Sequence, residues 1–118
     1  MQTVDLPQAS SKLDQLKSDL DEFGYAVVAG ALSLEQTGQI RGRLREQASL
    51  ERRLGFEIAD HVYDVKQTSV DHGSNQWVYG LVNKGDEFRI TLDQPLVRSL
   101  ITHALGREYI LSDLTAHI

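Results

Sequence analysis

Cysteine is absent from this chain of 118 residues. Its absence excludes disulfide bonds and thiolate chemistry, and it suits a reducing compartment. Proline is scarce too: Pro7 and Pro95 are the only two, so no proline-rich linker divides the sequence. The sequence also lacks a secretory leader and any apolar run long enough to span a membrane. These absences predict a single domain over residues 1–118, located in the cytoplasm and without a membrane partner.

Positively charged residues are fewer than negatively charged ones. Twelve Lys and Arg against seventeen Asp and Glu give a formal net charge of −5. This sign argues against nucleic acid as a partner. Hydrophobic residues make up 41% and charged residues 25% of the chain, as in ordinary globular domains. A chain of this length can bury a core without disulfides or metals to hold it.

Three segments have apolar residues at helical spacing, and they cover residues 11–23, 33–55 and 93–106. Gly24 can end the first of them in a left-handed conformation, and Gly106 can end the third. Asp93 can cap the third, and Pro95 suits its first turn. The sequence therefore predicts three helices.

Strand-like runs separate and follow these helices. They cover residues 25–29, 77–82, 88–92 and 109–118, with a further short strand near residues 62–65 inside a loop over residues 56–76. Helix is the competing interpretation for 77–82 and 88–92, because short apolar runs are ambiguous. Residues 83–86 read as a turn. The predicted fold class is α+β: three helices packed on a partial, mostly antiparallel sheet.

The four histidines raise the question of a metal site, and they are His61, His72, His103 and His117. A facial iron site needs two histidines and a carboxylate, commonly with the first pair arranged as His-x-Asp or His-x-Glu. None of the four has Asp or Glu two residues later. Asp64 lies three residues after His61, and Asp71 adjoins His72, so neither pair suits an extended segment. The residues predict no metal ligand and no catalytic residue.

Two other features allow a functional or a structural interpretation. The helix over residues 33–55 carries a basic cluster between Arg41 and Arg53, which is either a solvated face or a site for an anion or acidic partner. Trp77 and Tyr79 share one face of an extended segment, where they would pack in the core or line a pocket.

The order of elements resembles the N-terminal part of the phytanoyl-CoA dioxygenase family, which are iron(II)- and 2-oxoglutarate-dependent oxygenases. Two pieces carry most of the resemblance: Phe-Gly-Tyr-Ala-Val-Val at residues 23–28 and Ala-Leu-Gly-Arg-Glu-Tyr-Ile-Leu-Ser at residues 104–112. Further similarity lies in residues 20–22, in Ala31-Leu-Ser, in residues 76–84, at Phe88 and in residues 95–103. The resemblance extends over nearly the whole chain, which corresponds to well under half of the family's domain.

The resemblance implies the N-terminal portion of a double-stranded β-helix. In this family the His-x-Asp pair, the distal histidine and the arginine that binds the cosubstrate all follow the strand resembling residues 109–118. We therefore expect the chain alone to bind neither iron(II) nor 2-oxoglutarate and to be inactive, whereas the complete domain would hydroxylate a small organic substrate. By the same resemblance, Asn83 and Lys84 are expected to border the cosubstrate pocket.

A second interpretation is a complete, small, non-catalytic α+β domain. The apolar stretch at residues 109–118 has no turn or cap after it, and an uncovered strand edge can pair with another chain. Such a domain would form a homo-oligomer, or bind another partner, through its C-terminal strand. A third interpretation makes the basic helix an anion-binding module.

Overall fold

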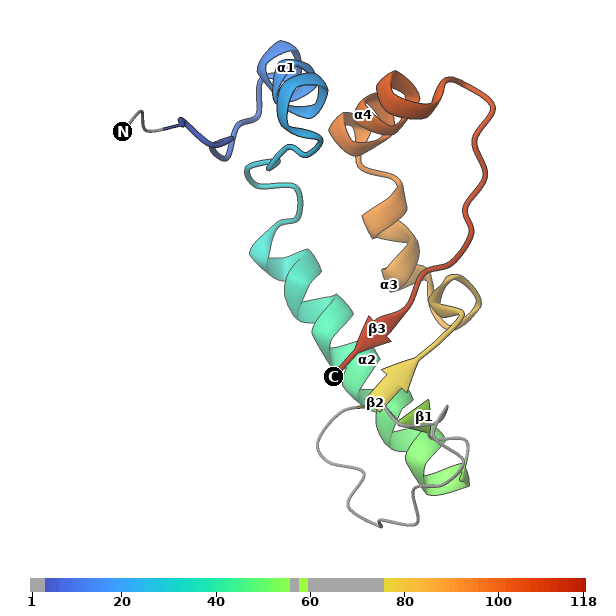
Figure 1. The fold of residues 1–118 in the computed structure, drawn as a ribbon. Coiled ribbons are helices and arrows are strands. Elements are labelled where there is room, and N and C mark those ends of the chain that lie inside the picture. The colour runs from blue at the N-terminus through green and yellow to red at the C-terminus, as the bar shows by residue number, and fades with distance from the viewer. Residues whose placement is uncertain (1–3, 56–57, 60–75) are drawn as a thin grey trace. The chain divides into compact units, whose positions relative to one another are not determined.

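The computed structural model describes residues 4–55, 58–59 and 76–118 (Figure 1). The predicted strand at residues 62–65 lies outside these ranges, as do His61 and His72. Of the loop predicted over residues 56–76, the described residues belong to strands instead, namely Ile58–Ala59 and the first residue of Gln76–Val78. In chain order the elements are α1 (Leu13–Phe23), α2 (Leu34–Leu54), β1 (Ile58–Ala59), β2 (Gln76–Val78), the 3-10 turn η1 (Leu81–Asn83), α3 (Asp86–Arg89), the 3-10 turn η2 (Ile90–Leu92), α4 (Pro95–Leu105) and β3 (Ala116–His117).

The three predicted helices are confirmed as α1, α2 and α4. Gly24 ends α1 with a φ of 81°, and its N–H donates to the Leu20 carbonyl oxygen. Only glycine adopts this left-handed conformation without a steric penalty. Helix α4 begins at Pro95, but its N-cap residue is Gln94 rather than the predicted Asp93. The N-cap of α4 therefore differs from the prediction, whereas the apolar spacing predicted the positions of the three helices correctly.

The fold class is α+β, as predicted. A three-stranded antiparallel sheet has the order β1-β2-β3, and β2 lies at its centre. Trp77 pairs with Ile58 on one side and with His117 on the other. Gln76 and Ile118 exchange two backbone hydrogen bonds of 2.8 Å, which attach the end of the chain to β2.

The predicted strand at residues 25–29 is wrong. Its segment forms a single parallel bridge between Val28 and Ser10, and Tyr25 and Val27 are exposed rather than buried. Valine and tyrosine favour an extended backbone, but a strand also needs a partner along its length. Here the described partner is the short stretch around Ser10, which bonds to the Val27 carbonyl oxygen and the Ala29 N–H at 2.9 Å each.

Of the two interpretations left open for residues 88–92, the strand is wrong and the helix is confirmed, because Phe88 lies on α3 and Ile90–Leu92 form the 3-10 turn η2. Asp86 and Glu87 occupy the first turn of α3, where negative charge favours a helix. The run at residues 77–82 divides between the two interpretations left open for it: β2 ends at Val78, and η1 begins at Leu81. Of residues 109–118, Ala116 and His117 form the strand.

Contacts divide the chain into two compact units. The α1–α4 unit consists of Met1–Ser33 and Ile90–Ile110, and the α2–sheet unit consists of Leu34–Arg89 and Leu111–Ile118. In the first unit α1 and α4 pack side by side (Figure 1), with Leu16 fully buried and Leu100 nearly so. A division by contacts does not show whether each unit folds alone. The single domain over residues 1–118 therefore stays a prediction.

The core of the α2–sheet unit forms where α2, β2 and α3 meet. Its buried members are Ala48, Val78, Leu81 and Phe88, and Ile40, Leu44, Leu114 and Ala116 pack around them. Phe88 is 2% exposed. The segment that leads into β3 is attached beside this core, because the Leu81 N–H donates to the Leu114 carbonyl oxygen at 3.0 Å.

Candidate functional site

The predicted cosubstrate residues Asn83 and Lys84 lie where η1 meets α3. The Lys84 ammonium donates to Glu51 Oε1 at 2.9 Å, and its backbone carbonyl oxygen accepts a 2.6 Å bond from Arg43 Nη2. Both partners belong to α2. Asn83 is exposed, and its N–H donates to the Gly80 carbonyl oxygen. The turn that carries both residues is therefore fastened to α2 through Lys84.

Gln47 closes this arrangement into a ring of hydrogen bonds. Its side-chain oxygen accepts from Arg43 Nη2 at 2.7 Å, and its Nε2 donates to Glu51 Oε2 at 3.2 Å. Glu51 is only 9% exposed, and a carboxylate this buried needs partners for both oxygens. The ring satisfies them. A cosubstrate carboxylate that binds Lys84 would have to displace Glu51. The cosubstrate role of Asn83 and Lys84 stays a prediction.

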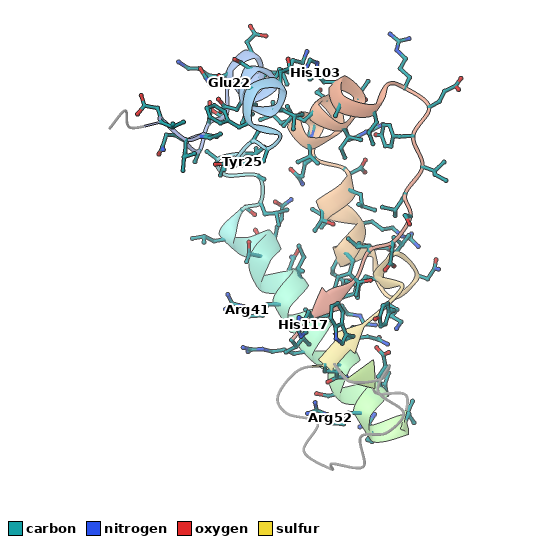
Figure 2. The ribbon with its side chains drawn as sticks, viewed as in Figure 1. Glu22, Tyr25, Arg41, Arg52, His103 and His117 are labelled. Atoms are coloured by element: carbon teal, nitrogen blue, oxygen red, sulfur yellow. The ribbon has the colours of Figure 1, made fainter. Side chains whose placement is uncertain are left out.

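The two histidines in the described part of the chain have separate surroundings. His103 on α4 lies 2.8 Å through its Nε2 from Asp21 Oδ1 on α1. His117 on β3 stacks on Trp77. Figure 2 labels both. Within the described residues, no three side chains of the metal-binding types gather around one point.

A row of rings covers one face of the sheet. The Trp77 ring lies 4.3 Å from that of His117 and 6.0 Å from that of Tyr79, and both neighbours are nearly parallel to it. The neighbouring residues Gln76 and Val78 face the opposite way and are buried, and Gln76 Nε2 donates to the Ala48 carbonyl oxygen of α2 at 3.0 Å. The sheet therefore has one face packed on α2 and one face lined by aromatic rings.

The shared face of Trp77 and Tyr79 follows from strand alternation and was predicted. The addition of His117 was not, because it depends on the register between β2 and β3. The sequence contains a partial signal for this contact, because a histidine in an apolar terminal strand has a flat ring that can stack. No spacing rule says which residue it meets.

The basic cluster of α2 separates into two kinds of arginine. Arg43 is partly buried within the hydrogen-bonded ring. The others are exposed, and they are Arg41, Arg45, Arg52 and Arg53; Figure 2 labels Arg41 and Arg52 along α2. This division supports the solvated-face interpretation for the exposed arginines and gives Arg43 a structural role.

Sequence reasoning missed a hollow in the α1–α4 unit. Its volume is about 730 Å³, and it is lined by Lys17, Arg98, Ser99, Thr102, Arg107 and Tyr109, with His103 and Leu13 beside them. Leu13 and Lys17 come from α1, and Arg107 and Tyr109 come from the segment after α4. The other lining residues belong to α4. Most of the lining lies within residues 98–109, but the hollow also needs Leu13 and Lys17 of α1, and no local sequence pattern shows that α1 packs there.

Comparison with known proteins assigns no family. No family model matches the chain, and no solved structure matches it significantly. The described helices include none that is both long and apolar enough to cross a membrane.

Proposed function

We propose that this chain is the N-terminal part of an iron(II)- and 2-oxoglutarate-dependent oxygenase of the phytanoyl-CoA dioxygenase type. The resemblance rests on residues 23–28 and 104–112, which lie at the carboxyl ends of α1 and α4. The α+β class is compatible with it. The observation that carries the proposal is the sheet itself: among the described strands, β1 and β3 each pair with β2 alone, so both outer edges can accept further strands.

The described residues do not fit the iron itself. His103 has Leu105 rather than a carboxylate two positions later. The side chains of His103 and His117 already contact Asp21 and Trp77, respectively. In a complete domain, residues outside this chain would bind iron(II) and 2-oxoglutarate, which would supply oxygen activation. The role of this chain would be to support that domain, with α2 packed on one sheet face and the ring-lined face turned to its interior. The substrate would be a small organic molecule, and the protein would work in the cytoplasm.

The test begins with the reading frame that encodes the chain. Downstream of the codon for Ile118 it should encode a His-x-Asp or His-x-Glu pair and a later histidine. The protein translated from the whole frame should bind iron(II) anaerobically and consume 2-oxoglutarate, while residues 1–118 alone should do neither. A frame without such a pair, or a whole protein that binds no iron(II), would overturn the proposal.

A second function is supported by the edge of β3. This strand pairs with β2 on one side within the described chain, and the nearby Leu111 and Ile118 are half exposed. A second copy, adding its own β3, would cover this edge in a homo-oligomer. Light scattering over a range of concentrations tests this, and a monomer at every concentration would exclude it.

A matched pair of variants sharpens that test. Gln76 and Ile118 exchange both of their backbone hydrogen bonds. We therefore expect alternation continued to Thr115, the residue just before β3, to direct its N–H away from β2. Thr115→Pro removes this donor and should give a monomer, whereas Thr115→Ala keeps it and should leave the oligomer intact. Both changes remove the hydroxyl hydrogen-bonded to Asp113, so their difference isolates the backbone edge.

A further inference from the structure

The hollow of the α1–α4 unit is positively charged within a negatively charged protein. Three permanent cations line it, namely Lys17, Arg98 and Arg107, and His103 adds a fourth basic group. No carboxylate belongs to its lining, although the chain as a whole carries a formal charge of −5. Cations gathered around one space repel one another unless an anion joins them.

Two of these basic groups already have carboxylate partners. Arg98 lies 3.4 Å from Asp93, in a pair whose side chains are both mostly exposed, and His103 lies 2.8 Å from Asp21. Lys17 and Arg107 have no hydrogen-bond or ion-pair partner among the described residues. They come from opposite ends of the sequence, and both line this hollow.

The remaining lining suits an anion that also has a neutral part. Ser99, Thr102 and Tyr109 contribute hydroxyl groups, which donate hydrogen bonds to anionic oxygens. Leu13 adds an apolar surface. The volume of about 730 Å³ lies within the range of sites for small molecules and exceeds what a single inorganic ion would fill. Arginine favours phosphate because its planar group donates two parallel hydrogen bonds.

We propose that this hollow binds a small phosphorylated organic molecule, with Lys17, Arg98 and Arg107 contacting its phosphate oxygens. The site belongs wholly to the α1–α4 unit. It is separate from the basic cluster of α2 and does not depend on iron or on any oxygenase activity.

Nuclear magnetic resonance of the whole chain tests the proposal, with inorganic pyrophosphate as the probe. We expect saturable shifts of the amide signals of Lys17, Ser99, Thr102 and Arg107, and a weaker affinity at high salt. Citrate at the same ionic strength serves as the carboxylate probe and should bind roughly tenfold more weakly.

Matched double variants separate this hollow from general attraction. Lys17→Gln with Arg107→Gln should weaken pyrophosphate binding by roughly tenfold or more. Since neither side chain has a partner in the described part of the chain, the amide spectrum should otherwise keep its folded pattern. Arg41→Gln with Arg45→Gln removes the same charge from the exposed face of α2 and should change the affinity by less than about twofold.

Three results would overturn the proposal. Shifts that never saturate, or an equal loss in both double variants, would mean that pyrophosphate responds only to net charge. Citrate binding as tightly as pyrophosphate would exclude phosphate as the preferred group. The outcome is independent of the oxygenase proposal, because iron and 2-oxoglutarate take no part in it.

Discussion

The imidazole of His117 lies flat against the indole of Trp77, with ring centroids 4.3 Å apart and planes 5° from parallel. The two residues are opposite each other in the pairing of β2 with β3. The β3 strand is therefore held by ring stacking as well as by the backbone bonds between Gln76 and Ile118. This relationship gives β3, which is only two residues long, a second means of attachment.

Removal of the His117 ring should loosen this attachment. His117→Ala should lower the free energy of unfolding by about 0.5–1.5 kcal/mol, the usual contribution of an aromatic pair. Trp77 is the chain's single tryptophan, so its emission should move to longer wavelength as water reaches the indole. His117→Phe should restore both quantities. An emission maximum unchanged by His117→Ala would contradict the stack.

The pair of Lys84 and Glu51 should contribute more than an exposed ion pair. Their side chains are 27% and 12% exposed, and Lys84→Met would leave a largely buried carboxylate with Gln47 as its remaining partner in the ring. We expect a loss of about 1–3 kcal/mol in the free energy of unfolding, measured by urea denaturation. Lys84→Met combined with Glu51→Leu should recover part of the loss, because no unpaired charge remains.

Arg89 and Asp86 provide the control for that measurement. They form a pair of the same length, 2.9 Å, but their side chains are 55% and 92% exposed. Asp86→Asn also removes a negative charge from the first turn of α3, and it should change the free energy of unfolding by no more than about 1 kcal/mol. Equal losses in Lys84→Met and Asp86→Asn would show that burial does not strengthen the former pair.

The difference between helices and strands explains which elements could be predicted. The backbone bonds of α1, α2 and α4 lie within each segment, so apolar spacing and residues such as Gly24 are sufficient signals. A strand depends on a partner elsewhere in the chain. Val27 and Val28 have the composition of a buried strand, but among the described residues their backbone pairs with the short stretch at Ser10 in a single bridge, and no local pattern reveals this.

The candidate sites, like the strands, depend on contacts between residues far apart in the sequence. Lys84 was singled out by family resemblance, but its contact with Glu51 spans 33 residues of sequence, so its role in fastening the turn was not predictable. Lys17 and Arg107 are farther apart still, and they line one hollow because α1 packs on α4. Charge counting pointed instead to α2, where arginines are neighbours in sequence.

Phe88 offers a direct check on the observed core. Its side chain is 2% exposed, so Phe88→Ala should lower the free energy of unfolding by about 3–5 kcal/mol through lost burial and a residual cavity. Leu34 on α2 is 94% exposed, and Leu34→Ala should stay within about 0.5 kcal/mol. Chemical denaturation measures both. Similar losses at the two positions would mean that Phe88 is not in the core.

Replacement of glycine by alanine should destabilise the protein at Gly24 and stabilise it at Gly38. Gly24 has a φ of 81°, and an alanine Cβ strains a left-handed backbone, so Gly24→Ala should cost about 1–2 kcal/mol. Gly38 lies inside α2, where an added Cβ would meet nothing within 4 Å. There alanine should stabilise by about 0.5–1 kcal/mol, because it loses less backbone freedom on folding and has the higher helix propensity. Thermal unfolding followed by circular dichroism measures the two shifts, and a shift of the same sign at both positions would contradict the assigned end of α1 or the helical course of α2.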